Sequence, residues 1–289
     1  MRDFTIENLT EIVLEEYSSK TKDPRTKQIV TSLITHLHDF VKDVELTEKE
    51  WFEAIMFLTD TGKICDEKRQ EFILLSDVLG VSMLVDAINH PKGGAGTEST
   101  VLGPFYVEGA PEKEYGASII KQAYDGEISL VTGKVTDKDG NPVAGAELDV
   151  WQTAGNGKYD VQDPGMPEYN MRGKFRSKED GSYAFVTEKP LPYSVPTDAT
   201  VGKLLNASGR HAMRPAHVHM IVSADGYETL TTHIFAAGDE YLDSDAVFAT
   251  KSSLIGDFKA SDDQALASEF GLPENFSHME FDIGLMPNS

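Results

Sequence analysis

The sequence predicts an α+β protein in which a helical N-terminal part precedes a β-sandwich or β-barrel. Up to about residue 90, apolar residues recur at helical spacing in several segments. From about residue 119 onward, short apolar runs alternate with turns rich in glycine and proline, a pattern typical of all-β domains. We place the boundary at residue 100, with a helical and linker region over 1–100 and a β domain over 101–289.

Four helical segments are expected in the N-terminal part. They cover residues 5–17, residues 25–44, a third segment that begins at Thr47, and about residues 67–88. The third segment opens with Thr47-Glu48-Lys49-Glu50, which has the form of a capping box. Because these amphipathic helices precede a domain with a β-type sequence pattern, we interpret them as an added layer that serves as an oligomer interface.

A connector rich in glycine and proline follows, over residues 89–111. Its segment Lys92-Gly93-Gly94-Ala95-Gly96 lacks the Gly-Lys-Ser/Thr ending of a phosphate-binding loop, so we interpret it as a linker. The expected strands cover residues 128–136, 146–152, 182–187, 217–224, 229–235 and 280–285, and residues 137–142 form a strong turn signal. The acidic residues within 239–245 are interpreted as a solvated turn.

Composition excludes several classes of function. The 289 residues contain 26 basic and 48 acidic side chains, a net charge of −22, which disfavours nucleic acid and anionic membrane surfaces as partners. Cys65 is the only cysteine, so an intramolecular disulfide and cysteine-based metal sites are excluded. We expect a cytoplasmic protein, since no signal peptide or membrane-spanning segment is recognisable.

One segment carries the strongest functional signal. Arg214-Pro215-Ala216-His217-Val218-His219-Met220-Ile221-Val222 places two histidines two residues apart at the start of an apolar, β-branched run. Side chains alternate across a strand, so these two imidazoles point to the same side. This spacing predicts that His217 and His219 bind one metal ion.

His36 and His38 have the same spacing in a different context. The apolar residues around them follow a helical period. Positions i and i+2 of a helix do not face each other, so we interpret both as surface or packing residues.

The other ligands of this metal must supply nitrogen or oxygen donors. Two neutral imidazoles suit zinc, copper, nickel or iron. A carboxylate would give a two-histidine, one-carboxylate iron(II) site, for which Asp160 is a candidate. Tyrosines are the other choice. Tyr159 follows a Gly-Asn-Gly-Lys loop, and Tyr193 lies in the stiff, proline-rich segment 190–196.

Four motifs, taken in order over nearly the whole chain, resemble the intradiol ring-cleaving catechol dioxygenases. They are Leu102-Gly103-Pro104-Phe105-Tyr106, Gly157-Lys158-Tyr159, Pro192-Tyr193-Ser194-Val195-Pro196, and Gly209-Arg210-His211 continuing through Arg214-Pro215-Ala216-His217-Val218-His219. The resemblance implies an antiparallel β-sandwich as the catalytic domain, preceded by a helical dimerisation layer. It also implies a homodimer whose helical interface encloses a phospholipid.

The same resemblance implies a non-haem iron(III) held by Tyr159, Tyr193, His217 and His219, with a solvent hydroxide completing the shell. Iron(III) is a hard cation that can remove the proton of a phenol whose free pKa is ~10. In the family, Tyr193 would be the ligand that the substrate displaces. Arg214 would face the pocket and stabilise negative charge on the ring, and its alternative role is a structural salt bridge.

Three further segments, residues 72–80, 231–235 and 238–248, most resemble the hydroxyquinol-cleaving branch of this family. By that resemblance the substrate pocket comprises Leu74, Asp77, Val101, Leu102, Gly103, Pro104, Phe105, Val195, Pro196, Arg214 and Val247. Asp77 would accept a hydrogen bond from a third ring hydroxyl, which allows strong discrimination against substrates that lack it. His233 would lie beside the metal ligands, where catechol-cleaving members carry glutamine.

The implied reaction is cleavage of hydroxyquinol (benzene-1,2,4-triol) by O2 to 3-hydroxy-cis,cis-muconate, seen as maleylacetate. Cleavage of catechol or a chlorocatechol is the alternative within the family. Two other classes stay open from the residues alone. One is an iron(II) oxygenase or zinc hydrolase that uses His217 and His219 with a carboxylate, and the other is a non-catalytic β-sandwich binding module.

Overall fold

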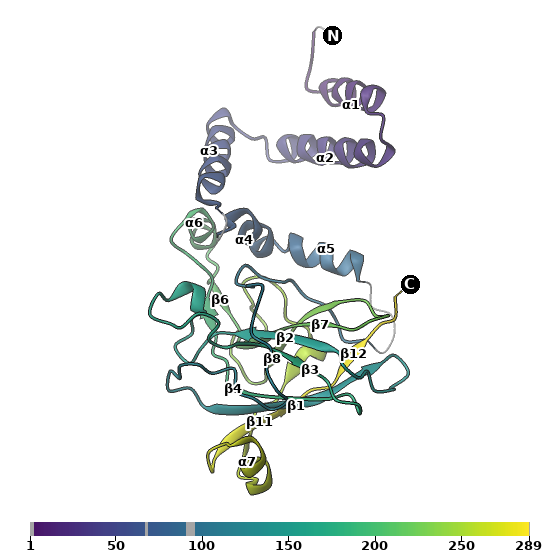
Figure 1. Cartoon of the computed structure of the whole chain (residues 1–289). Helices are drawn as coiled ribbons and strands as arrows, with labels where there is room; N and C mark the ends of the chain where they lie inside the picture. The colour runs from purple at the N-terminus through teal and green to yellow at the C-terminus, as the bar shows by residue number, and fades with distance from the viewer. Residues whose placement is uncertain (1–2, 67–68, 91–95, 289) are drawn as a thin grey trace. The chain divides into compact units, whose positions relative to one another are not determined.

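The computed structural model describes residues 3–66, 69–90 and 96–288 (Figure 1). Contacts divide the chain into two compact units, and the division along the chain falls between Asp60 and Thr61. The segment after Thr61, helical at first, therefore belongs to the same unit as the sheets. The sequence-based boundary at residue 100 stays a prediction.

The first unit holds α1 (Leu9–Lys20) and α2 (Pro24–Asp43), and α3 (Glu48–Ile64) crosses the division. The capping box is confirmed, since the Glu50 amide donates to Thr47 Oγ1 at 3.3 Å and the Thr47 amide donates to Glu50 Oε2 at 3.0 Å. His36 and His38 lie on α2, as expected. His38 Nδ1 lies 3.1 Å from Thr10 Oγ1, so it joins α2 to α1.

The prediction of a single helix over residues 67–88 is wrong. The structure has two helices, α4 (Glu71–Val78) and α5 (Val81–Asn89). Gly80 separates them with a φ of 73°, a left-handed conformation that glycine adopts without steric cost. Glu67, where the expected helix begins, and the linker residues 92–95 lie outside the described residues.

The second unit contains two five-stranded sheets and a two-stranded ribbon in the part of the chain that is described. One sheet runs β10-β11-β1-β12 with β4 also paired to β1, the other runs β3-β2-β7-β8-β9, and β5 pairs with β6. The strands are β1 (Ile128–Asp137), β2 (Glu147–Gln152), β3 (Arg172–Arg176), β4 (Ser182–Glu188), β5 (Tyr193–Ser194), β6 (Met213–Arg214), β7 (His217–Ser223), β8 (Leu230–Ala236), β9 (Ile255–Gly256), β10 (Lys259–Ser261), β11 (Phe276–Glu280) and β12 (Ile283–Leu285). The helices are α4, α5, α6 (Thr200–Ala207) and α7 (Gln264–Phe270), with short 3-10 turns η1 (Asp160–Gln162) and η2 (Ser252–Leu254).

The expected sandwich is confirmed, and its pairing is mostly antiparallel. Parallel pairs also occur, between β1 and each of β11 and β12 and between β8 and β9. The strand expected over residues 280–285 is divided into β11 and β12. The division lies opposite Gly133 of β1. At this point the Phe281 carbonyl oxygen comes within 1.9 Å of the place that a Cβ on residue 133 would occupy. Only glycine permits this approach.

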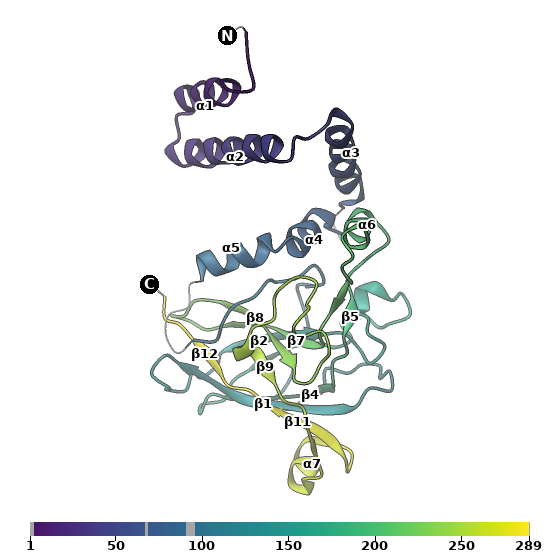
Figure 2. The same ribbon diagram turned by 180° about the vertical axis from the view of Figure 1, so that it is seen from behind.

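The two large sheets pack face to face, and their inner faces form the main core. In β7 the core residues are Val218, Met220 and Val222, every second position of the strand. His217 and His219 therefore lie on the outer face of the same strand. In both views α4 and α5 lie over this sheet (Figures 1 and 2). No helix within the described residues has both the length and the hydrophobicity that a membrane span requires.

Candidate metal centre and substrate cavity

The outer face of β7 brings two histidines together. The Nε2 atoms of His217 and His219 lie 3.0 Å apart, and both side chains are 2% exposed. His233 of β8 stands directly across from His219, with ring centroids 4.1 Å apart. Trp151 of β2 stands across on the other side and stacks on His219, at 4.6 Å and an interplanar angle of 12°. One ligand atom from each of the three histidines lies within 4.8 Å of the others.

The hydrogen bonds around the cluster define which nitrogen atoms can bind a cation. His217 Nδ1 lies 2.7 Å from the Pro215 carbonyl oxygen, to which it donates. The Nε2 atom of the neutral ring therefore carries the lone pair and faces the cluster. Within the described residues, His219 Nδ1 and His233 Nε2 are buried without a hydrogen-bond partner. His219 Nε2 is the atom that faces His217 and Tyr159, so Nε2 of both His217 and His219 is directed at the point where a cation would lie.

Two tyrosines reach the same point from separate segments. Tyr159, at the N-cap of η1, places its hydroxyl 2.9 Å from His219 Nε2. Tyr193 belongs to β5, and its hydroxyl lies 3.4 Å from Arg214 Nη1. The two phenol rings are 5.4 Å apart and nearly perpendicular. The four residues expected as metal ligands therefore converge in one buried cluster.

Burial keeps the three histidines and Tyr159 uncharged when no cation is present. Burial, followed by the charge of Arg214, lowers the pKa of His217 to about 3. The pKa values of His219 and His233 are also well below their ordinary value, with burial as the main cause. Burial raises the pKa of Tyr159 well above its ordinary value. Neutral imidazoles are the form that binds metals, and a bound cation would reverse the effect on the phenol.

Arg214 is the cationic side chain of this site and is 2% exposed. Its Nη1 atom lies 3.4 Å from the Tyr193 hydroxyl and 3.3 Å from His217 Nε2. Burial opposes its charge, but Asp245 and Tyr193 outweigh burial, so the pKa of Arg214 is raised. The salt bridge considered from the sequence is present, with Asp245. The same guanidinium therefore forms the salt bridge with Asp245 and also faces the Tyr193 phenol.

A small cavity lies beside these groups. Its walls are formed by Leu74, Asp77, Val101, Gly103, Pro104, Phe105, Tyr193, Val195, Pro196, Arg214 and Val247. Every residue expected in the pocket lines this cavity except Leu102, which is 42% exposed. Tyr193 lines the cavity as well, whereas Tyr159 is not among the lining residues.

Asp77 contributes a carboxyl group to an otherwise largely apolar wall. It is 3% exposed, and burial raises its pKa, opposed by a Ser82 hydrogen bond and by Arg214. The helix that carries it, α4, is anchored by the buried Glu71. The Glu71 carboxylate accepts from the Val201 amide at 3.1 Å and pairs with Arg69 at 3.0 Å.

Comparison with known proteins gives the family. The model for "Dioxygenase" matches residues 101–287, and that for "Catechol dioxygenase N terminus" matches residues 23–97. The chain belongs to the intradiol dioxygenase family. It is 55% identical to a hydroxyquinol 1,2-dioxygenase of Rhizobium sp. (strain MTP-10005), over 86% of this chain and 84% of that protein. It is 51% identical to a 6-chlorohydroxyquinol 1,2-dioxygenase of Cupriavidus pinatubonensis, over 93% of this chain and 97% of that protein.

Solved structures agree with this family. The chain resembles the crystal structure of a hydroxyquinol 1,2-dioxygenase from Pseudomonas putida DLL-E4 with a TM-score of 0.91 and 48% identity. That match covers 98% of this chain and 99% of the other. A catechol 1,2-dioxygenase from Acinetobacter radioresistens gives a TM-score of 0.85 at 30% identity, covering 100% of this chain and 95% of that one. The fold and the helical N-terminal part are thus those of an intradiol dioxygenase.

Two expectations about acidic residues need correction. Asp160, a candidate carboxylate ligand, instead pairs with the buried Arg172 at 2.6 Å. Asp245, expected in a solvated turn, is 4% exposed and bound to Arg214. Sequence reasoning also missed Trp151 as a neighbour of the ligands, because side-chain alternation along β2 does not give the pairing that sets Trp151 opposite His219.

The three buried histidines predict a pH dependence of stability in the metal-free protein. They stay neutral when folded but protonate near pH 6.5 once unfolded, so the unfolded chain binds more protons below that pH. Stability should therefore fall as the pH is lowered from 7.5 to 5.5, by about 1.4 kcal/mol for each histidine. Urea unfolding of the chelator-treated protein measures this. The His233→Gln variant should lose about 1.4 kcal/mol less than the unaltered protein, and equal losses would contradict the prediction.

Proposed function

We propose that this chain holds iron(III) through Tyr159, Tyr193, His217 and His219 and cleaves the ring of hydroxyquinol, benzene-1,2,4-triol. The proposed reaction inserts both atoms of O2 at the bond between two neighbouring hydroxyl-bearing carbons. Its product is 3-hydroxy-cis,cis-muconate, a tautomer of maleylacetate. The observation that supports the metal assignment most is that the Tyr159 hydroxyl and His217 Nε2 each lie within 3.0 Å of His219 Nε2 in a buried site.

The donor set suits iron(III) better than zinc or iron(II). Two phenolates are hard, anionic oxygen donors that favour the more highly charged ion, and they offset its charge in a buried site. A two-histidine, one-carboxylate site would need a free carboxylate, but Asp160 is held by Arg172. When bound, iron(III) would supply a hard cation for the two diol oxygens and would activate the ring toward O2.

The side chains around the cavity have separate roles in proton uptake, charge stabilisation and exclusion of water. Tyr193 lines the cavity, so its phenolate oxygen meets the incoming diol and can take up one of its protons. Arg214 lies beside it as a fixed cation that stabilises the negative charge of the deprotonated ring. Apolar side chains such as Leu74, Val195 and Val247 form much of the wall and exclude water from the substrate.

Asp77 supports the triol over catechol or a chlorocatechol. Its buried carboxyl group lies in the same cavity as Arg214 and Tyr193, where it can accept a hydrogen bond from the third ring hydroxyl. A substrate that lacks this hydroxyl would leave the buried carboxyl group with its Ser82 hydrogen bond alone, which costs free energy. The similarity to hydroxyquinol-cleaving relatives points to the same substrate.

Metal analysis and visible spectroscopy test the iron assignment. The purified protein should contain iron(III), absorb visible light through its phenolate ligands, and consume O2 with benzene-1,2,4-triol. Tyr193→Phe should weaken the visible band and slow turnover on the order of 100-fold or more. Tyr17→Phe, the same change at an exposed position of α1, is the control and should alter neither. A colourless protein with stoichiometric zinc would reject the proposal.

The role of Asp77 is tested by comparing two substrates on one variant. Asp77→Leu keeps a similar shape but removes the acceptor, so kcat/KM for the triol should fall about 10- to 100-fold. The value for catechol should stay nearly constant or rise. Leu74→Met, a volume-conserving change on the same helix, should affect both substrates alike. Equal losses for triol and catechol in Asp77→Leu would remove Asp77 from substrate recognition.

The proposed quaternary state is a homodimer with a phospholipid in its helical interface. Ile29, Leu33, Leu37 and Phe40 recur at helical spacing on α2, and each is at least 50% exposed. Sedimentation equilibrium should give twice 31.8 kDa, and solvent extraction should release phospholipid. Leu33→Lys should shift the protein toward the monomer, whereas Ser32→Lys, at the adjacent exposed position, should not. A monomeric unaltered protein would contradict this assembly.

A further inference from the structure

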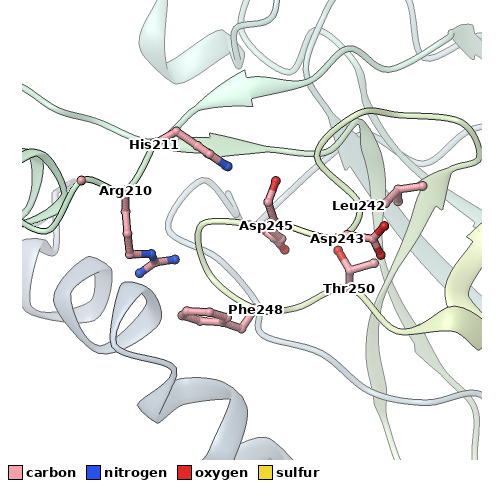
Figure 3. Close-up of a pocket in the computed structure, with 9 residues that line it drawn as sticks. Arg210, His211, Leu242, Asp243, Asp245, Phe248 and Thr250 are labelled. Carbon is pink, nitrogen blue, oxygen red and sulfur yellow. The ribbon is translucent and has the colours of Figure 1, made fainter.

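Asp245 lies on the loop between β8 and β9, which separates the substrate cavity from a second, open pocket. The open pocket is lined by Gly209, Arg210, His211, Leu242, Asp243, Ser244, Asp245, Phe248 and Thr250 (Figure 3). Figure 3 shows Asp245, Phe248 and Thr250 on one loop, with Arg210 and His211 on the segment opposite. Two neighbours of Asp245 along this loop face different ways, since Val247 lines the substrate cavity while Phe248 lines the open pocket.

Both oxygens of the Asp245 carboxylate are fully occupied. Oδ1 accepts from Arg214 Nε at 3.0 Å and from the Val247 amide at 3.2 Å. Oδ2 accepts from Arg214 Nη2 at 3.3 Å and from the Ala249 amide at 3.1 Å. The carboxylate therefore ties one cationic side chain to two backbone positions of the loop, and all four bonds lie out of solvent.

The loop needs these bonds because its backbone is strained. Phe248 has a φ of 59°, a left-handed conformation that bulky residues rarely adopt, and its side chain is 54% exposed. The Asp245 side chain binds the amides on both sides of Phe248, and the Asp245 carbonyl accepts from the Phe248 amide at 3.0 Å. This arrangement turns Phe248 outward and leaves Val247, 3% exposed, against the substrate cavity.

The same carboxylate determines where Arg214 points. A guanidinium is planar, so once Nε and Nη2 are fixed the remaining nitrogen, Nη1, has a defined direction. Nη1 is the atom that lies 3.4 Å from the Tyr193 hydroxyl and 3.3 Å from His217 Nε2. Without the carboxylate, Arg214 would be a buried cation free to turn toward other acceptors.

We infer that Asp245 is a positioning residue for ring cleavage: it aims the Arg214 guanidinium at the Tyr193 oxygen and holds Val247 in the cavity wall. The inference rests on the proposed function, because it assigns to Arg214 the stabilisation of charge on the bound ring. Asp245 is not among the residues that line the substrate cavity, and its side-chain bonds within the described residues go to Arg214 and the loop, through which it acts.

Asp245→Asn tests this inference, with Asp243→Asn as the matched control. Asp243 is exposed, lies two residues away and carries the same charge, but it makes no contact with Arg214 among the described interactions. In Asp245→Asn, kcat for the triol should fall about 10- to 100-fold with a smaller change in KM. The iron content should stay that of the unaltered protein, and the visible band should move to longer wavelength, because the phenolate loses a hydrogen-bond donor. Asp243→Asn should match the unaltered protein in all three properties.

A double-mutant cycle with Arg214→Met separates positioning from a general structural role. If Asp245 acts through Arg214, adding Asp245→Asn to Arg214→Met should slow turnover far less than the same change does in the unaltered protein, and the loss that remains measures the effect on the Val247 loop. The same 10- to 100-fold loss in both backgrounds would overturn the inference. Asp245→Glu serves as a second variant in case Asp245→Asn folds poorly. Because it keeps the negative charge, it should recover part of the lost kcat and the original wavelength of the visible band.

A crystal structure of metal-free Asp245→Asn distinguishes failure of this inference from failure of the proposed function. The expected result is an Arg214 guanidinium turned away from the Tyr193 hydroxyl and a shifted loop at Val247. An unchanged guanidinium overturns the inference even if the unaltered protein cleaves the triol. An unaltered protein without ferric iron or O2 uptake rejects the proposed function, whatever the position of Arg214.

Discussion

The alternation of side chains along β7 is the constraint on which the site depends. Val218, Met220 and Val222 enter the core between the two sheets, so the histidines at the intervening positions must face outward. A shift of one residue in register would expose the core residues and bury the imidazoles between the sheets. When the sandwich folds, His217 and His219 are therefore placed side by side. The strand alone holds these two proposed ligands, and no loop is needed to position them.

The site combines neutral ligands with one fixed cation. The imidazoles and the Tyr159 phenol are uncharged when no metal is present, whereas Arg214 keeps its charge because Asp245 accompanies it. A bound metal would therefore enter a region that already holds a positive charge. Anionic phenolates would offset both charges, which gives a physical reason for tyrosine ligands here rather than a purely histidine-based set.

The sequence predicted those parts that local geometry determines. His217 and His219 followed from strand alternation, and the helices of the first unit followed from their period. The tyrosines lie in irregular segments, and only the resemblance to a known family brought them to the site. Asp245 could not be predicted, because its burial depends on Arg214, 31 residues earlier in the chain. The division between β11 and β12 depends in the same way on Gly133, which lies about 150 residues earlier in the chain.

Trp151 gives the protein an internal optical probe. The chain has two tryptophans, of which Trp51 is 55% exposed on α3, whereas Trp151 is 1% exposed and stacked on His219. Emission from the indole at position 151 comes from a dry environment in contact with a proposed ligand ring. A paramagnetic ion bound to that ring would quench the blue-shifted component selectively, so fluorescence alone can follow loading of the site.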